Sequence, residues 1–134
     1  MGIPALILDT SAAMALFLQE EEGYQIEESL KELISSNGQI IVPSLFWYEV
    51  GNTLVSALNR KRITIEELRG IEIDLAELPI VTDPLPDSAI HIRTREIAVS
   101  KKLTFYDASY VELALRLQLP LESFDKRILA ALSH

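Results

Sequence analysis

Short apolar runs alternate along the chain with longer segments in which apolar residues recur every three or four positions. The runs predict four buried strands, at residues 5–8, 40–42, 79–82 and 121–124. The periodic segments predict seven helices, at residues 12–18, 24–35, 45–60, 65–77, 87–100, 107–117 and 125–132. Such alternation is typical of an α/β fold in which helices cover both faces of a short, mostly parallel sheet.

Polar residues mark several of the predicted helix starts. Thr64 and Glu67 stand three residues apart, which is the spacing of a capping box. Ser44 is a candidate N-cap for the helix that follows it. Asp107 and Asp125 each stand at the first position of a predicted helix, where an aspartate commonly caps the free N–H groups.

Three of the aspartates also occupy positions where an α/β fold places its active site. Asp9 directly follows the first predicted strand, Asp125 directly follows the last one, and Asp107 begins a helix. In open parallel sheets, ligands bind in the crevice beyond the carboxyl ends of the strands. A fourth acid, Glu49, is the only charged residue between positions 39 and 59 and lies at the edge of an apolar helix face.

Each acid also has a purely structural interpretation. Asp9, Asp107 and Asp125 can serve as N-caps, and a carboxylate can cap with one oxygen while the other binds a metal. Glu49 can be the one solvated residue of an amphipathic helix. The hydroxyls of Thr10 and Ser11, which follow Asp9, can bind a carboxylate or a ligand water, but we expect them to cap the next helix.

Composition narrows the class of protein. A chain of 134 residues with 49% hydrophobic residues suits a single domain over residues 1–134. The net charge of −8 argues against a broad basic surface for nucleic acid. Residues 1–49 hold eight acids and one base, so the acidic excess lies mostly in the first third. A polyanion can still bind locally where a divalent metal neutralises carboxylates.

Cysteine is absent, which excludes disulfides, thiolate zinc sites and cysteine nucleophiles and agrees with a reducing, cytoplasmic location. No apolar run approaches the roughly 20 residues of a membrane helix, so we expect no membrane association. The first residues have the pattern of a strand and not of a secretion signal. His91 is isolated and His134 ends the sequence, so zinc is disfavoured and both are expected to be surface or structural residues.

Four acids from distant segments would raise one another's pKa if they met without a countercharge. A divalent ion resolves this conflict, and magnesium prefers oxygen ligands. Such an ion can activate water and stabilise the charge on phosphorus, which is what phosphodiester hydrolysis requires. The residues alone therefore favour metal-assisted hydrolysis of a phosphodiester.

Four stretches resemble, in order, the motifs of the PIN-domain family, and most closely the toxin half of VapC-type prokaryotic toxin–antitoxin pairs. They are residues 6–12, 42–52, 104–114 and 121–129, each containing one of the four acids. A small departure is Ser123, which stands where threonine is commoner.

The resemblance implies a three-layer α/β/α sandwich and an endoribonuclease that acts on RNA. It implies a Mg²⁺ or Mn²⁺ centre formed by Asp9, Glu49, Asp107 and Asp125. It also implies a homodimer that a cognate antitoxin protein holds inactive. One alternative is the same fold used to bind RNA or a partner with little or no cleavage. Two other acidic-pocket α/β proteins are disfavoured. A receiver needs paired acids early and a lysine after a late strand, but the acid after the first strand is single and no lysine has such a position; an aspartyl phosphatase needs a second aspartate where Ser11 stands.

Basic residues gather at positions 60–62, 101–102 and 126–127. We interpret the first group as a solvated helix end. Lys126 and Arg127 adjoin Asp125 and are better placed to meet a phosphate. Phe17, Phe46 and Trp47 are expected to lie in the core.

Overall fold

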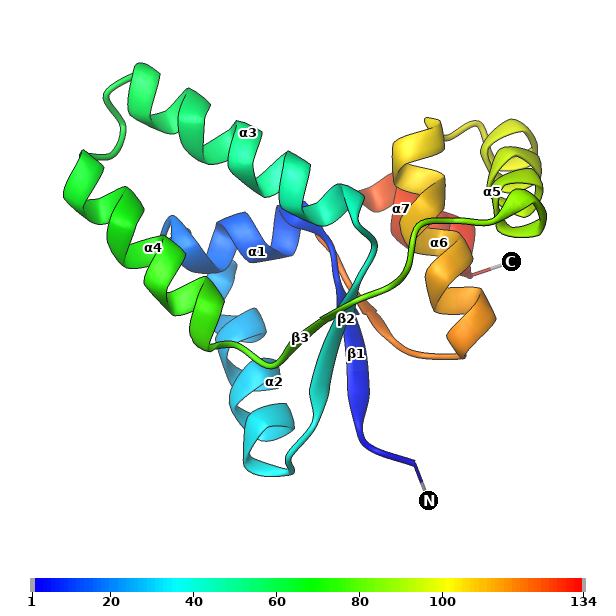
Figure 1. Cartoon of the computed structure of the whole chain (residues 1–134), viewed down its shortest axis with the longest axis horizontal. Helices are drawn as coiled ribbons and strands as arrows, with labels where there is room; N and C mark the ends of the chain where they lie inside the picture. Colours follow the sequence, from blue (N-terminus) through cyan, green and yellow to red (C-terminus); the bar gives the residue numbers. More distant parts are fainter. Residues whose placement is uncertain (1, 134) are drawn as a thin grey trace.

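Residues 2–133 are described by a computed structural model, in which a four-stranded sheet is flanked by seven helices (Figure 1). All strand pairs are parallel, and the order is β3-β2-β1-β4. The strands are β1 (Ala5–Leu8), β2 (Gln39–Val42), β3 (Ile80–Thr82) and β4 (Leu121–Glu122). The α/β fold with a short parallel sheet is thus confirmed.

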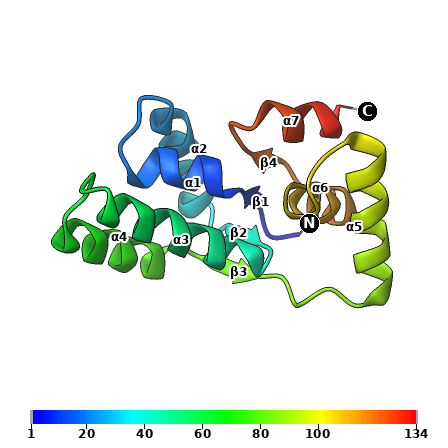
Figure 2. The same cartoon turned by 90° about the horizontal axis from the view of Figure 1, so that it is seen from above.

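Helices cover both faces of this sheet. Viewed from above, α1 to α4 lie on one side of the strands and α5 to α7 on the other (Figure 2). The helices are α1 (Thr10–Phe17), α2 (Gly23–Ser35), α3 (Leu45–Asn59), α4 (Ile65–Glu77), α5 (Ser88–Lys101), α6 (Phe105–Leu117) and α7 (Lys126–Leu132). Within residues 2–133, none of them is long and apolar enough to cross a membrane.

Strand β1 lies in the middle of the main core because its four residues are all apolar. Ile7 and Leu8 are fully buried, which is expected for a strand covered on both faces. A second, smaller core joins α5, α6 and α7 and their connections. Its buried members are Ala98, Leu103, Ala108, Val111, Ile128 and Ala131.

The helix boundaries agree with the predicted ones to within two residues. The capping box is confirmed, because the Glu67 N–H donates to Thr64 Oγ1 at 3.1 Å and the Thr64 N–H donates to Glu67 Oε1 at 3.0 Å. The expected cap at Ser44 is wrong. Ser44 has helical backbone angles and its side chain makes no capping bond, since the helical conformation already begins there.

A charge network joins α6 to the segment after β3. The Arg116 guanidinium donates to Glu112 Oε2 at 2.9 Å and to Asp83 Oδ2 at 2.7 Å. The Glu112 side chain is only 4% exposed, and Arg93 approaches it to 3.6 Å from α5. The network therefore joins three segments around one buried carboxylate.

Candidate active site

Asp9 stands where β1 ends and α1 begins. Its backbone N–H donates to the carbonyl of Glu122 at 3.1 Å, which extends the pairing of β1 with β4 by one residue. Its Oδ1 accepts the Ala12 N–H at 2.9 Å, so Asp9 is the N-cap of α1. The residue is only 3% exposed. The carboxylate is therefore buried at the carboxyl edge of the sheet.

Two serine hydroxyls hold the Asp9 carboxylate. Ser11 Oγ donates to Asp9 Oδ1 at 2.7 Å, and Ser123 Oγ donates to Asp9 Oδ2 at 2.5 Å. Each serine also accepts a backbone N–H from the segment after β4, that of Phe124 at 3.0 Å for Ser11 and that of Asp125 at 2.9 Å for Ser123. These bonds tie the start of α7 to the end of β1 and bring Asp125 to the same edge as Asp9.

Glu49 reaches the site from α3. Its Oε1 accepts a hydrogen bond from Thr10 Oγ1 at 2.9 Å and one from the Tyr110 hydroxyl at 2.7 Å. Burial raises the pKa of Tyr110, and the nearby Glu49 carboxylate raises it further, so the hydroxyl stays protonated and able to donate. Glu49 is thus held through one oxygen by residues of α1 and α6.

Asp107 and Asp125 differ in their local roles. Thr104, and not Asp107, is the N-cap of α6: its Oγ1 accepts the Asp107 N–H at 3.0 Å. The expectation that Asp107 begins its helix as a cap is wrong, because the threonine three residues earlier takes that position. Asp125 does cap α7, with Oδ1 accepting the N–H groups of Arg127 and Ile128 at 2.9 and 3.4 Å.

Asp125 acts electrostatically on both of the other aspartates. Burial raises the pKa of Asp9, and the negative charge of Asp125 adds to the rise, while hydrogen bonds from Ser123, Ala12 and Ser11 oppose it. Burial and the charge of Asp125 also raise the pKa of Asp107, against the effects of the Thr104 hydrogen bond and the Arg127 charge. The site therefore concentrates negative charge that its own donors do not fully offset.

The acids share one edge of the sheet but are not gathered into a ready coordination shell. Within residues 2–133, no group of three acidic or histidine side chains is placed to hold a metal ion. The donor chemistry nevertheless fits a hard divalent cation, because Asp9 is buried and its hydrogen-bond partners are all neutral. Magnesium characteristically keeps several waters and binds through one or two carboxylates, so it needs no closed cage.

The family model of the PIN domain matches residues 6–133. The chain belongs to the PIN domain family. Among solved structures, the crystal structure of PAE2754 from Pyrobaculum aerophilum is similar to this chain, with a TM-score of 0.67 and 24% sequence identity. The similarity covers 98% of this chain and 86% of that one, and at this identity it shows the fold alone. No curated protein gives a match.

Several side chains of this PIN domain were assigned wrongly or missed from the sequence. Thr10 and Ser11 were expected to cap α1, but Asp9 caps it and the two hydroxyls bind the carboxylates of Glu49 and Asp9. Tyr110 was not singled out, although it stands one helical turn after Asp107 on α6. That spacing was the one available signal, because residues three positions apart share a helix face.

The predicted positions of the aromatic and histidine residues are correct for some of them and wrong for Trp47. Phe46 is fully buried as expected, and Phe17 is partly buried against the core. Trp47 is 40% exposed, so its assignment to the core is wrong; its Nε1 donates to Thr82 Oγ1 at 2.9 Å, which places it at the rim of the sheet. His91 is exposed and packs on Phe105, while His134 lies outside the described residues.

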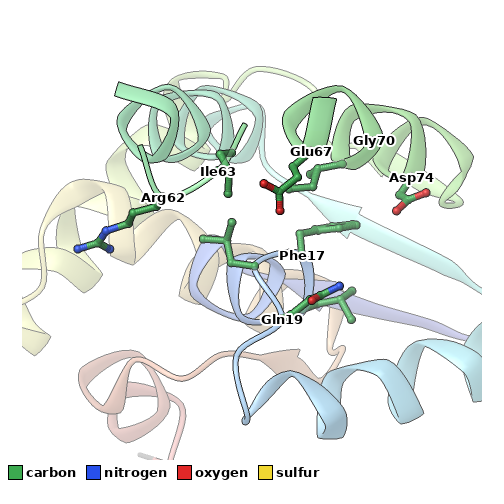
Figure 3. A pocket seen from close by; sticks show the side chains of 10 residues that line it. Phe17, Gln19, Arg62, Ile63, Glu67, Gly70 and Asp74 are labelled. Carbon is green, nitrogen blue, oxygen red and sulfur yellow. The ribbon is translucent and has the colours of Figure 1, made fainter. Parts of the chain in front are cut away.

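Two of the hollows on the α1–α4 side of the molecule bear on where the site opens. The one beside the carboxylates measures about 510 Å³ and is lined by Thr10, Ser11, Met14, Glu20, Glu22, Thr53 and Phe124. The other, of about 460 Å³, lies between the end of α1 and helix α4, where Phe17 and Gln19 face Glu67 and Asp74 (Figure 3). The first hollow adjoins the site, because two of its lining residues, Thr10 and Ser11, donate hydrogen bonds to Glu49 and Asp9, whereas no residue of the second hollow does so.

Replacing Asp9 by asparagine is expected to stabilise the metal-free protein at neutral pH. Burial raises the pKa of Asp9 in the folded state, so stability is lost as the pH rises from its ordinary value of 3.8 through the folded-state pKa. Asparagine keeps an acceptor for the Ala12 N–H but carries no charge. Thermal unfolding at about pH 7 should show a melting temperature about 2–7 °C above the parent's, equivalent to about 0.5–2 kcal/mol.

The difference between the two melting temperatures should shrink as the pH falls toward 3.8 and below, because the parent's Asp9 then becomes protonated in the unfolded state as well as in the folded one. Asp87→Asn is the matched control, because Asp87 caps α5 through the Ile90 N–H at 2.9 Å but is exposed. A melting temperature of the Asp9 variant at or below the parent's would show that ionised Asp9 does not strain the metal-free fold.

Proposed function

We propose that this PIN domain is a metal-dependent endoribonuclease whose centre is formed by Asp9, Glu49, Asp107 and Asp125. The observation that carries the proposal is the buried Asp9 carboxylate, which only neutral donors hold and which the charge of Asp125 approaches. A buried anion without a cationic partner is costly, and active sites are where such costs are retained. Membership of a family with a nuclease-type fold supports the same conclusion.

Each side chain has a defined task in this proposal. The four carboxylates would hold a Mg²⁺ or Mn²⁺ ion, which when bound supplies an activated water and stabilises charge on the phosphate. Ser11 and Ser123 orient Asp9, and Thr10 and Tyr110 orient Glu49. Because these partners donate hydrogen bonds without adding positive charge, the carboxylates keep their full attraction for a cation.

The biological role that we propose is that of a toxin in a VapC-type toxin–antitoxin pair. Its support is the resemblance of the four sequence stretches, which also underlies the proposed homodimer and the proposed antitoxin partner. The test is whether production of the chain arrests bacterial growth and whether a protein encoded beside it restores growth. Arrest that an Asp107→Asn variant causes equally well would argue against a toxin acting through cleavage.

The enzymatic proposal is tested with a labelled single-stranded RNA under three ionic conditions. Cleavage to internal fragments is expected with Mg²⁺ or Mn²⁺ and none with chelator. With Ca²⁺ the RNA is expected to bind without being cut, because a larger ion with looser geometry supports binding better than turnover. Binding without cleavage in every metal would instead identify a PIN-fold binding module, the alternative function.

A further inference from the structure

Charge is divided unevenly between the two sides of the sheet. Residues 1–87, which include α1 to α4, carry fifteen acidic and five basic side chains. Residues 88–134, which include α5 to α7, carry five acidic and seven basic ones. Two of those five acids, Asp107 and Asp125, belong to the proposed metal centre. A polyanion that reaches this centre is therefore repelled on the α1–α4 side and accepted on the α5–α7 side.

Acidic and basic side chains are also separated in the immediate surroundings of the four carboxylates. On one side, the hollow beside Thr10 and Ser11 is bordered by Glu20 and Glu22. On the other side, Lys126 and Arg127 directly follow Asp125 and are exposed. Phosphates are thus favoured along α7 and not along the start of α2.

Helix stability does not explain these two basic residues. Lys126 and Arg127 are the first residues of α7, where the helix dipole disfavours positive charge. By contrast, Lys101 lies in the last turn of α5, where a cation complements the dipole. Lys126 and Arg127 therefore occupy positions that cost the helix a little stability, which is consistent with a role in binding.

An exposed aromatic ring lies on the same side of the centre. Tyr106 is 61% exposed and immediately precedes Asp107. It also stands one turn before Tyr110, whose hydroxyl bonds Glu49, so both tyrosines share the helix face directed at the carboxylates. The neighbouring Phe105 packs on His91 with ring centroids 4.9 Å apart, whereas no aromatic pair among the described residues includes Tyr106.

We propose that the substrate is a single strand that crosses the centre on the α6–α7 side, with its phosphates on Lys126 and Arg127 and an unpaired base stacked on Tyr106. This inference rests on the proposed ribonuclease function and adds the residues that bind the strand. Stacking on an exposed ring requires an unpaired base, because the faces of paired bases are covered by their neighbours in the duplex. The binding surface is thus small and lies beside the metal centre, in an acidic protein without a broad basic face.

The experiment measures RNA affinity in Ca²⁺ by fluorescence anisotropy and cleavage in Mg²⁺, on the same proteins. The variants are Lys126→Gln/Arg127→Gln and Tyr106→Leu. Arg60→Gln/Lys61→Gln is the matched control for charge. Tyr24→Leu is the matched control for an exposed ring, because Tyr24 is 73% exposed on α2. Light scattering reports the mass of each protein, and thermal unfolding reports whether it folds.

The charge variant is expected to weaken binding and to lower the slope of log affinity against log salt by about 1.4, which is about 0.7 for each lost phosphate contact. Tyr106→Leu is expected to weaken binding of the single strand by about 5- to 150-fold and to leave a blunt duplex unaffected. Both controls should match the parent within about twofold.

Three outcomes would overturn this inference. If the parent neither binds nor cuts RNA, the proposed function fails and the inference fails with it. If the parent cuts RNA but both variants behave as the controls do, this surface is not the binding surface and the proposed function stands. If the variants lose binding together with a change in protein mass, the surface is an interface between copies of the chain.

Discussion

Replacing Asp107 by asparagine is expected to lower the rate of metal-dependent RNA cleavage by about 10³-fold, equivalent to about 4 kcal/mol of transition-state stabilisation. Asp107 is the most informative of the four acids, because Thr104 caps α6 and the Asp107 carboxylate makes no hydrogen bond among the described residues. Its removal therefore tests the function of the carboxylate without disturbing the helix start. Single-turnover kinetics at saturating Mg²⁺ measures the effect.

Asp87→Asn is the matched control, because it makes the same substitution at the start of α5, away from the centre. It should cleave RNA at the parent's rate. Both variants should unfold within about 1 kcal/mol of the parent, which shows that the fold is retained. If the Asp107 variant cleaves RNA as fast as the parent and with the same metal dependence, Asp107 is not part of the metal centre.

Replacing Arg116 by methionine is expected to destabilise the fold by about 3–5 kcal/mol, which lowers the melting temperature by about 10–18 °C. Methionine preserves much of the side-chain length but removes the charge that holds both Glu112 and Asp83. The Glu112 side chain is 4% exposed, so it would be left buried with only the more distant Arg93. Urea unfolding measures the change in the free energy of unfolding.

Two further variants distinguish the contribution of the buried Arg116–Glu112 pair to the free energy of unfolding from that of an ordinary surface charge. Arg93→Met should cost less than about 1 kcal/mol, because Arg93 is half exposed and approaches Glu112 only to 3.6 Å. Arg116→Met/Glu112→Gln should recover part of the loss, because the second change neutralises the stranded carboxylate. Equal losses for Arg93→Met and Arg116→Met would contradict the special role of Arg116.

The sheet and most helix boundaries were predictable because they depend on local patterns. The first strand is a run of four apolar residues, which can only be buried. The acid after it must either leave the core or be compensated within it, and Asp9 is compensated by hydrogen bonds at the sheet edge. The capping box of α4 pairs Thr64 with Glu67, three positions later, so the local sequence is enough to predict it. The start of α6 was misplaced because Phe105 and Tyr106 look like an extended connection, although Thr104 was an available cap.

The hydrogen-bond partners of the acids were not predictable in the same way. Glu49 bonds Thr10 and Tyr110, which are 39 and 61 residues away in the sequence. Ser123 lies 114 residues from Asp9 and reaches it only because β4 pairs with β1. A single sequence does not indicate which residues that are far apart in the chain will form hydrogen bonds in the fold. Only part of the charge network around Arg116 depends on such long-range contacts: Glu112 and Arg116 are four residues apart on α6, a local spacing that the sequence shows, whereas Asp83 and Arg93 come from the segment after β3 and from α5.

The proposed metal centre requires that the four carboxylates together bind a divalent ion. Calorimetric titration of Mn²⁺ into the purified protein at about pH 7 tests it most directly, in the parent, in Asp87→Asn and in the single variants Asp9→Asn, Glu49→Gln, Asp107→Asn and Asp125→Asn. We expect saturable binding by the parent and by Asp87→Asn, and an affinity at least about tenfold lower in each of the other four. Undiminished Mn²⁺ affinity in those four variants, or no binding by the parent, would contradict it.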